Sequence, residues 1–251
     1  MKEKLKRGDL TLGAWITIGH PDVAEIMANA GFDWLLFDTE HAPLNIEIVQ
    51  NQLQAMSNTE TVPIIRVAWN DMVLIKRALD IGAYGVVIPW VNNREDAKNA
   101  VRYCRYPTEG LRGVGPRRAA RYGLDSEYLL RADEEILIVA QIETREAVDN
   151  IEDIVSVEGI DATFIGPSDL SASLGLMGQP FHPKVIQAIE KVLDACLSSG
   201  VAAGLAYAQT IEELVKFIRM GFRFVGATSD MGLLLGKSME VLKDIKERLK
   251  S

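Results

Sequence analysis

The run VPIIRVAWNDMVLIKRALDIGAYGVVIPWVNNREDAKNAVRYC, residues 62–104, contains the pattern that decides the fold. Two short apolar segments, 62–67 and 84–90, are each followed by a segment with helical periodicity, 71–82 and 94–104. The apolar segments are continuous rather than alternating, which is typical of strands buried on both faces of a parallel sheet. The stretch therefore predicts two consecutive βα units.

The same unit recurs on both sides of this stretch. Further strands are expected at 12–18, 34–38, 136–143, 161–166, 201–207 and 222–227, and further helices at 21–31, 45–57, 144–157, 182–200, 210–221 and 231–250. Eight βα units in a chain of about 250 residues are what a (β/α)8 barrel needs. The alternative is an open doubly wound sheet, but the first βα turn, ITIGHPD, lacks the GxGxxG of its dinucleotide-binding version. We predict one (β/α)8 (TIM) barrel domain over residues 1–251.

The composition is that of an ordinary folded chain, with 48% hydrophobic and 25% charged residues. A net charge of −8 argues against nucleic acid as a partner but leaves open a local basic pocket for a small anion. No apolar run reaches the ~18 residues of a membrane span, and the start MKEKLKRGD lacks the apolar region of a signal peptide. Cys104 and Cys196 are not a CxxC pair, so we expect buried or unreactive thiols and a cytoplasmic location.

One segment, residues 106–135, is too long for an ordinary βα connection and is rich in glycine and arginine. Arg112, Arg117, Arg118 and Arg121 could bind an anion from this loop. A solvated or subunit-contacting loop is an equally good interpretation.

The chemistry of a (β/α)8 barrel is built at the carboxyl ends of its strands. The polar residues expected there are Asp38, Glu40, His41, Arg66, Gln141, Glu143, Ser168, Asp169, Tyr207, Thr228, Ser229 and Asp230. No lysine or cysteine stands at a predicted strand end, which argues against a Schiff-base aldolase and against a thiol nucleophile. The run GPSDLS lacks the second glycine of a serine nucleophile elbow.

Glu143 and Asp169 follow adjacent predicted strands and should face the barrel mouth together. Two carboxylates there could hold a hard divalent cation, act as a general acid and base, or form structural salt bridges. We favour the cation, because Mg²⁺ commonly takes one or two protein carboxylates together with water and substrate oxygens. Zinc is less suitable, since it prefers histidine and cysteine.

His41 and Arg66 are the other two candidates for chemistry. A lone loop histidine is more often structural, but Asp38 and Glu40 flank His41, and nearby carboxylates make an imidazole more basic. A buried arginine is costly unless it is paired, so Arg66 either stabilises an anionic intermediate or pairs with a carboxylate such as Asp38. Asp80, near the end of a predicted helix, is expected at the surface.

Long motifs of the chain resemble a known family. The runs FDWLLFDTEHAPLN, YPTEGLRGVGPRRAARYG and QIETREAVDNIEDIVSVEGIDATFIGPSDLSASLG are similar to those of the metal-dependent 2-oxo-acid aldolases of the HpcH/HpaI type. This family includes the 4-hydroxy-2-oxo-heptanedioate and 2-dehydro-3-deoxyglucarate aldolases. The resemblance runs from about Gly8 to beyond Ser229.

The resemblance implies a role for each candidate at the mouth. Glu143 and Asp169 match the metal ligands, for Mg²⁺, Mn²⁺ or Co²⁺. Gln141, Ser168 and Asp169 match substrate-binding positions, although relatives often have alanine in place of Ser168, whose backbone amide would contact the substrate carboxylate.

The resemblance also implies the catalytic residues and an assembly. His41 matches the proton acceptor, and Arg66 matches the arginine that stabilises the transition state. Asp80 matches the acid that raises the basicity of that histidine, which in this family can come from the adjacent subunit. A homo-oligomer, usually a hexamer, is implied, with the last helix packed against a neighbouring subunit.

The implied activity is reversible retro-aldol cleavage of a 4-hydroxy-2-oxo acid to pyruvate and an aldehyde. Sugar-acid, dicarboxylic and aromatic acceptors all remain open. One alternative is a CoA-thioester lyase of the citrate lyase or malyl-CoA type. Another is a catalytically silent barrel that serves as a binding protein, which would be expected to have lost at least one of Glu143, Asp169, His41 and Arg66.

Overall fold

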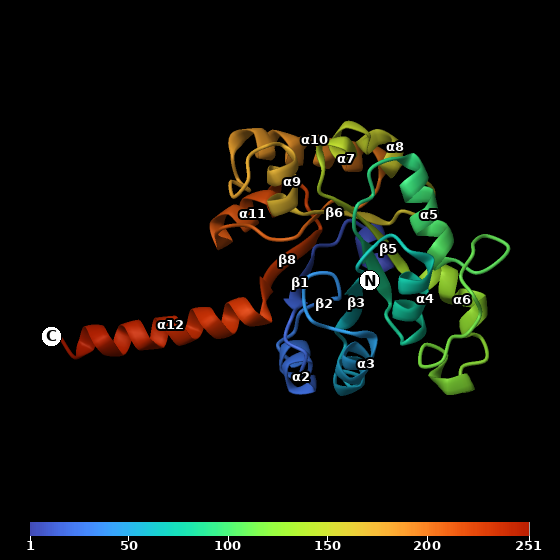
Figure 1. Ribbon diagram of the computed structural model, residues 1–251, viewed down its shortest axis with the longest axis horizontal. Coiled ribbons are helices and arrows are strands. Elements are labelled where there is room, and N and C mark those ends of the chain that lie inside the picture. Colours follow the sequence, from blue (N-terminus) through green and yellow to red (C-terminus); the bar gives the residue numbers. More distant parts are fainter. Residues whose placement is uncertain (251) are drawn as a thin grey trace.

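The computed structural model describes residues 1–250 and contains a closed barrel of eight parallel strands (Figure 1). The strands are β1 (Thr11–Ile16), β2 (Trp34–Asp38), β3 (Val62–Arg66), β4 (Gly85–Ile88), β5 (Leu137–Ile142), β6 (Ala162–Ile165), β7 (Gly204–Leu205) and β8 (Phe224–Ser229). Each pairs with the next in parallel, and β8 pairs with β1 to close the ring. The predicted (β/α)8 barrel is confirmed.

Helices follow the strands as predicted. They are α2 (Pro21–Asn29), α3 (Ile46–Ala55), α4 (Met72–Asp80), α5 (Arg94–Cys104), α7 (Arg145–Asp149), α8 (Ile151–Val155), α10 (Pro183–Ser199), α11 (Ile211–Met220) and α12 (Asp230–Arg248). Three short helices were not predicted: α1 (Lys2–Lys6), α6 (Tyr128–Glu135) and α9 (Pro167–Ser173).

Two elements differ from the prediction for local reasons. The single helix expected over 144–157 is divided into α7 and α8 at Asn150, whose side-chain amide donates 2.9 Å to the carbonyl of Asn92. Strand β7 is much shorter than the run 201–207, and a Cβ at Gly204 would lie 2.3 Å from the carbonyl of Thr163. A glycine is therefore required where these two backbones approach.

The inside of the barrel is a separate apolar cluster. Trp34 stacks on Phe224 with ring centroids 4.3 Å apart, and both side chains are fully buried. Their bulk is accommodated by Gly13, where an added Cβ would lie 1.9 Å from Cδ2 of Trp34. Leu5 of α1 belongs to the same cluster.

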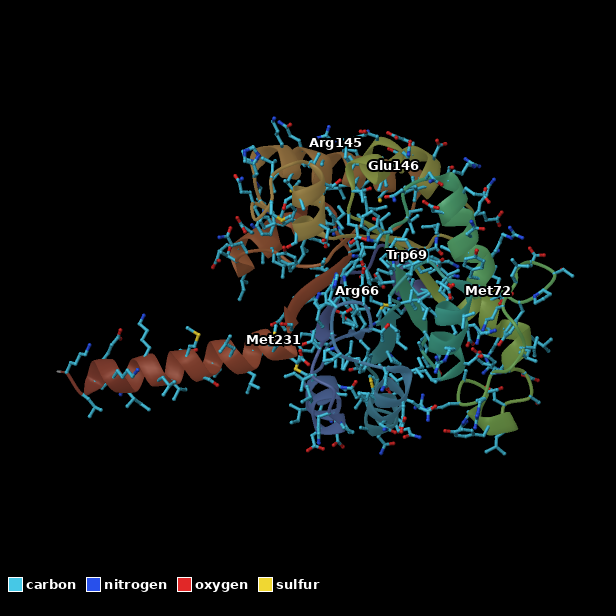
Figure 2. All side chains as sticks on the ribbon, viewed as in Figure 1. Arg66, Trp69, Met72, Arg145, Glu146 and Met231 are labelled. Atoms are coloured by element: carbon cyan, nitrogen blue, oxygen red, sulfur yellow. The ribbon has the colours of Figure 1, made fainter. Side chains whose placement is uncertain are left out.

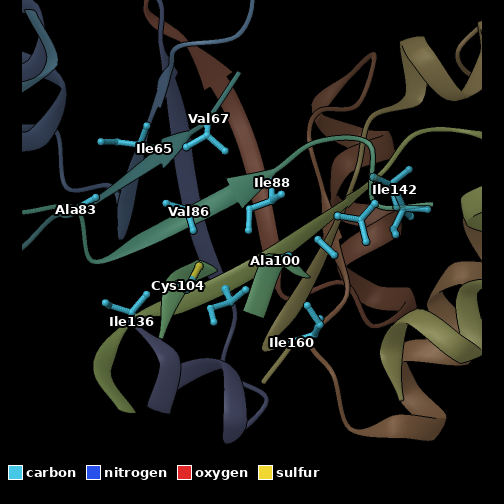
Figure 3. Packing of buried hydrophobic residues seen from close by; sticks show 14 of the residues in the cluster. Ile65, Val67, Ala83, Val86, Ile88, Ala100, Cys104, Ile136, Ile142 and Ile160 are labelled. Atoms are coloured by element: carbon cyan, nitrogen blue, oxygen red, sulfur yellow. The ribbon is translucent and has the colours of Figure 1, made fainter. Parts of the chain in front are cut away.

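A second, larger cluster fills the layer between strands and helices. Figure 3 shows part of it, with Ile65, Val86 and Ile88 of β3 and β4 in one group with Ala100 and Cys104 of α5. Cys104 and Cys196 are both free and buried, as expected from the sequence.

Side chains alternate between the two faces of a strand, and this alternation determines which residues face the barrel mouth. Leu36 and Ile64 belong to the interior cluster, so Asp38 and Arg66, two residues further along β2 and β3, point to the same side. The register places Asp38 directly beside Arg66. On β5 the inward series continues from Val139 to the polar residue Gln141 and to Glu143 after the strand. Polar inward residues therefore gather at the carboxyl ends of the strands.

The long 106–135 segment is anchored by two of its arginines. Arg112 is fully buried, donates 2.7 Å to Asp80 and lies over the ring of Tyr106 at 4.5 Å. Arg118 donates to the carbonyls of Ile81 and Leu53 at 3.0 and 2.9 Å. Since these two guanidinium groups hold the segment to the barrel, the structure favours a structural role over anion binding for them.

Helix α12 extends away from the barrel (Figure 1). It is joined to the barrel by Asp230, whose carboxylate accepts from the backbone N–H groups of Thr17 and Ile18 at 2.9 and 2.8 Å. Beyond its first turn the helix carries exposed apolar side chains, among them Leu234, Leu242 and Ile245. Within residues 1–250, no helix is both long enough and apolar enough to span a membrane.

Candidate active site

The centre of the barrel mouth is a buried ion pair between Arg66 and Asp38. Nη2 and Nε of Arg66 donate to the two carboxylate oxygens of Asp38 at 2.7 and 3.0 Å. Burial alone would raise the pKa of Asp38, but the hydrogen bonds and charge of Arg66 outweigh it and lower that pKa. The guanidinium also lies over the ring of Trp15 at 4.5 Å. The pairing expected for Arg66 is present, and Nη1 makes no hydrogen bond within residues 1–250.

Glu40 is the third member of this charged group. Its Oε2 lies 3.3 Å from Nε of Arg66, and Oε1 lies 3.9 Å from Nε2 of His41. Burial raises the pKa of Glu40 to about 7, against the attraction of Arg66 and with the added repulsion of Glu143. This site can therefore hold a proton near neutral pH.

His41 is exposed at the mouth, with 63% of its side chain accessible. Its backbone N–H donates 3.2 Å to Asp38, which orients the loop. The other two histidines, His20 and His182, accept from backbone N–H groups at the starts of α2 and α10 and therefore act as helix caps. His41 is the histidine that lies beside the charged group of Arg66, Asp38 and Glu40.

Glu143 is buried beside Gln141, and both of its oxygens accept hydrogen bonds. One accepts from the side-chain amide of Gln141, and the other accepts from the backbone N–H of Trp90 at 2.9 Å. Burial raises the pKa of Glu143, these hydrogen bonds lower it, and the nearby charge of Asp169 raises it again. The net direction is a raised pKa, with burial as its largest cause.

Asp169 and Ser168 lie in the first turn of α9, directly after β6. Asp169 and Glu143 line the same cavity, of about 730 Å³. The hydroxyl of Ser168 contacts the hydroxyl of Tyr207, which follows β7. The predicted residues of β5 and β6 are therefore brought to one side of the mouth.

Glu143 and Asp169 provide oxygen ligands of the kind that a hard divalent cation takes. Glu143 is buried with a raised pKa, and Asp169 adds a second negative charge. Within residues 1–250, no cluster of three or more His, Cys, Asp or Glu side chains could hold a metal. A two-carboxylate site completed by water and substrate oxygens suits Mg²⁺ or a similar hard ion.

Asp80 does not join this group within one chain. It ends α4, the helix that returns from the mouth to the opposite end of the barrel, and its carboxylate binds Arg112 at 2.7 Å. Its side chain is half-buried rather than fully exposed, which corrects the expectation of a surface position. Burial raises the pKa of Asp80, and Arg112 opposes that rise.

Sequence reasoning missed the part played by Trp90. None of the polar residues expected at the strand ends comes from β4, but Trp90, just after β4, contributes a backbone N–H. No residue type signals such a donor. Trp90 also has φ +56°, in the left-handed region that bulky residues rarely adopt.

A closed parallel barrel whose mouth gathers acidic residues, an arginine and a histidine has its polar groups where (β/α)8-barrel enzymes carry their active sites. The chain matches the HpcH/HpaI aldolase/citrate lyase family over residues 11–236 and belongs to that family. The predicted family is confirmed, and the protein is an enzyme of the lyase class.

Individual relatives agree with this placement. The chain is 44% identical over 236 residues to the 4-hydroxy-2-oxo-heptane-1,7-dioate aldolase of Salmonella dublin, covering 93% of this chain and 89% of that protein. It superposes on an HpcH/HpaI aldolase/citrate lyase family protein from Burkholderia cenocepacia J2315 with TM-score 0.94, 35% identity and 98% coverage of both chains. For the HpcH/HpaI aldolase from Desulfitobacterium hafniense DCB-2 the TM-score is 0.91, at 33% identity and 98% and 96% coverage.

Proposed function

We propose that this enzyme is a divalent-metal-dependent aldolase that reversibly cleaves a 4-hydroxy-2-oxo acid to pyruvate and an aldehyde. The observation that carries the proposal is a pair of carboxylates, Glu143 and Asp169, that line one cavity. The charge of Arg66 acts on Glu143. The similarity to a 4-hydroxy-2-oxo-heptane-1,7-dioate aldolase supports it. The lack of a strand-end lysine also supports it, since an amine-based aldolase would need one.

Glu143 and Asp169 would hold the cation. When bound there, it would supply a Lewis acid that polarises the 2-oxo group of the substrate. Gln141 would assist in two ways: its amide N–H group orients Glu143, and its buried Oε1 has no partner within residues 1–250 and can accept from a bound ligand. The backbone amide of Ser168 would contact the substrate carboxylate.

Arg66 and His41 would perform the bond cleavage. His41 accepts the proton of the 4-hydroxyl, directly or through a water, as the C3–C4 bond breaks and the aldehyde forms. The electron pair of that bond remains on the three-carbon unit, whose developing negative charge Arg66 stabilises through its unpaired Nη1. Protonation of C3 then gives pyruvate.

The proposal extends to the assembly. We propose that Asp80 acts on His41 of a neighbouring copy, because in its own chain it lies at the far end of the barrel. We also propose a homo-oligomer, such as a hexamer, in which α12 packs on another copy, and a single domain over residues 1–251. A cytoplasmic location fits two free buried thiols.

The proposal is tested by measuring pyruvate release from a panel of 4-hydroxy-2-oxo acids. We expect EDTA to abolish release and Mg²⁺, Mn²⁺ or Co²⁺ to restore it. Glu143→Gln should lower both Mn²⁺ affinity and turnover by at least about 100-fold, whereas Glu25→Gln, at an exposed glutamate of α2, should change neither. His41→Ala should lower turnover by about 10²–10⁴-fold with Mn²⁺ affinity retained.

Three results would contradict parts of this proposal. Release that survives complete chelation excludes the metal-dependent reaction. Unchanged Mn²⁺ affinity in Glu143→Gln removes the ligand assignment. Cleavage of malyl-CoA without any release from 4-hydroxy-2-oxo acids would favour the CoA-thioester lyase instead.

A further inference from the structure

The proposed cleavage needs two proton transfers, and His41 performs only one of them. His41 takes the proton of the 4-hydroxyl, and C3 of the three-carbon unit must then gain a proton. Because C3 is bonded to the carbon that carries the hydroxyl, the donor to C3 should lie close to His41. It should also lie close to Arg66, which stabilises the charge on the same three-carbon unit. Figure 2 shows Arg66 among the strands of the barrel.

Glu40 lies between these two groups. Its Oε2 is 3.3 Å from Nε of Arg66, and its Oε1 is 3.9 Å from Nε2 of His41. The side chains of Glu40 and His41 start from one turn, because Oδ1 of Asp38 accepts from the backbone N–H groups of both residues at 3.0 and 3.2 Å. Oε2 is buried and has no hydrogen-bond partner within residues 1–250. Glu40 therefore lies against Arg66 with one oxygen, and its other oxygen is the one nearer to His41.

The gap between Glu40 and His41 can be bridged. A separation of 3.9 Å is longer than a hydrogen bond. However, 63% of the His41 side chain is exposed, so a side-chain rotation or one bridging water brings its imidazole into reach of Oε1. Only 11% of the Glu40 side chain is exposed, so neighbouring atoms restrict the movement of its carboxyl group away from Arg66.

The other charged groups of the mouth have different roles. Glu143 and Asp169 would hold the cation. Both oxygens of Asp38 accept from Arg66, at 3.0 and 2.7 Å, so a proton on Asp38 would disrupt that ion pair. An arginine keeps its proton in proteins. Among these groups, Glu40 is left as the carboxyl group for C3.

The proton affinity of Glu40 suits a group that takes and gives a proton. Burial is the largest cause that raises its pKa to about 7. The charges that act on it are those of Arg66, Glu143, His41 and Asp38. A cation at Glu143 would remove part of the repulsion, whereas Asp80 of a neighbouring copy, which the proposed assembly brings to His41, would add to it. A carboxyl group with a pKa near neutrality exchanges a proton with an imidazole in both directions.

We propose that Glu40 is a further catalytic residue, which passes the proton that His41 takes from the 4-hydroxyl to C3 of the three-carbon unit. This inference rests on the proposed aldolase function and deepens it by naming the group that completes the reaction.

The transfers balance without a proton from solvent. The C3–C4 bond breaks as His41 takes the 4-hydroxyl proton, and the electron pair of that bond stays on the three-carbon unit. The imidazolium of His41 gives this proton to Oε1 of Glu40. Oε1 gives it to C3, where the electron pair forms the new C–H bond. At the end His41 is neutral and Glu40 is ionised, as both were at the start, so the relay does not require a protonated Glu40 at rest.

The test compares two reactions in Glu40→Gln, Glu40→Asp and His41→Ala, with Mg²⁺ as the metal. Deuterium exchange at C3 of pyruvate in D₂O, without aldehyde, reports proton transfer at C3. Aldehyde release from a 4-hydroxy-2-oxo acid that the wild type cleaves reports the whole reaction. The affinity for Mn²⁺, measured separately, reports the cation site. Glu25→Gln, at an exposed glutamate of α2, is the matched control.

We expect Glu40→Gln to lower deuterium exchange by about 100-fold or more, with Mn²⁺ affinity retained. Glu40→Asp keeps the carboxyl group and should restore part of the exchange. His41→Ala should lower aldehyde release much more than exchange, because water can replace His41 as the proton partner of Glu40. Glu25→Gln should change none of these quantities.

A chemical trap separates proton transfer from a positioning role. Without a donor to C3, the three-carbon unit remains an enolate after the C3–C4 bond breaks. Ferricyanide oxidises enolates, so it should raise aldehyde release by Glu40→Gln about tenfold and leave the wild type unchanged. If Glu40 only positioned Arg66, the variant would form little enolate and the trap would have no effect.

Three results overturn the inference. The first is deuterium exchange in Glu40→Gln within about threefold of the wild type. The second is aldehyde release by Glu40→Gln that does not respond to ferricyanide, which would make Glu40 a positioning residue for Arg66. The third is a loss of exchange in His41→Ala as large as that in Glu40→Gln, which would assign the C3 proton to His41. A wild type with neither exchange nor cleavage overturns the aldolase function itself, whereas any of the three results with an active wild type overturns only the role of Glu40.

Discussion

Glu40 illustrates at the scale of one residue how burial changes chemistry. In the sequence it is a loop glutamate beside His41, and nothing marks it as buried. In the structure its carboxylate packs against Arg66, and burial and the charge of Glu143 raise its pKa to about 7. Because one of its oxygens has no hydrogen-bond partner within residues 1–250, the ionised form is poorly compensated.

The raised pKa of Glu40 predicts a pH dependence of stability. Between pH 4.5, the ordinary pKa of a glutamate, and about pH 7, the folded state binds more protons than the unfolded state. The free energy of unfolding should therefore fall as pH rises through this range. Glu40→Gln should remove this contribution, so the variant should gain stability relative to the wild type as pH rises.

The measurement is urea unfolding at several pH values in EDTA, with Glu25→Gln as the exposed control. If the free energies of unfolding of wild type and Glu40→Gln changed in parallel with pH, the pKa of Glu40 would not be raised by burial, and the prediction would be wrong.

At the scale of elements, the packing of β1 against the barrel interior depends on Gly13. Trp34 of β2 occupies the space that a side chain at this position would take. The sequence LGAWITI predicts a strand, but the need for a glycine within it comes from a residue of the next strand. Strand β7 also needs a glycine, since a Cβ at Gly204 would lie 2.3 Å from the carbonyl oxygen of Thr163 on β6.

A pair of glycine substitutions tests this account. Gly13→Ala should destabilise the protein by about 3 kcal/mol or more, because the added Cβ overlaps the Trp34 ring. Gly236→Ala, on exposed α12 with open space around it, should stabilise by up to about 1 kcal/mol through helix propensity. Urea denaturation measures both. Equal effects of the two changes on the free energy of unfolding would show that the contact with Trp34 does not require a glycine at position 13.

At the scale of the whole molecule, α12 stands apart from the barrel (Figure 1). A helix that leaves Leu234 and Leu242 exposed loses the free energy of their burial unless another surface covers them. The proposed oligomer supplies that surface, and it would also bring Asp80 of one copy to the mouth of another.

Two substitutions on α12 test the assembly. Leu234→Glu with Leu242→Glu should shift the protein to a smaller species in light scattering coupled to size exclusion, because charges would replace buried apolar contacts. Lys246→Glu, at an exposed polar position of α12, should leave the mass unchanged. A monomeric wild type would contradict the proposed assembly.

The barrel and most of the residues at its mouth can be predicted from the amino-acid sequence alone. Continuous apolar runs that alternate with helical periods allow few other folds. The ends of the predicted strands place Asp38, Arg66, Glu143 and Asp169 at the mouth. The sequence could not determine which of these groups are paired, because ion pairing and burial depend on distances between strands.

The roles of backbone and loop groups depend on the tertiary structure. The N–H of Trp90 meets Glu143 across 53 positions of sequence, and Arg112 meets Asp80 across 32. The pairing of β4 with β5 creates the first contact, and the packing of the 106–135 segment against the end of α4 creates the second. A backbone donor is the same in every residue except proline, so its direction depends on φ and ψ, which residue identity does not specify.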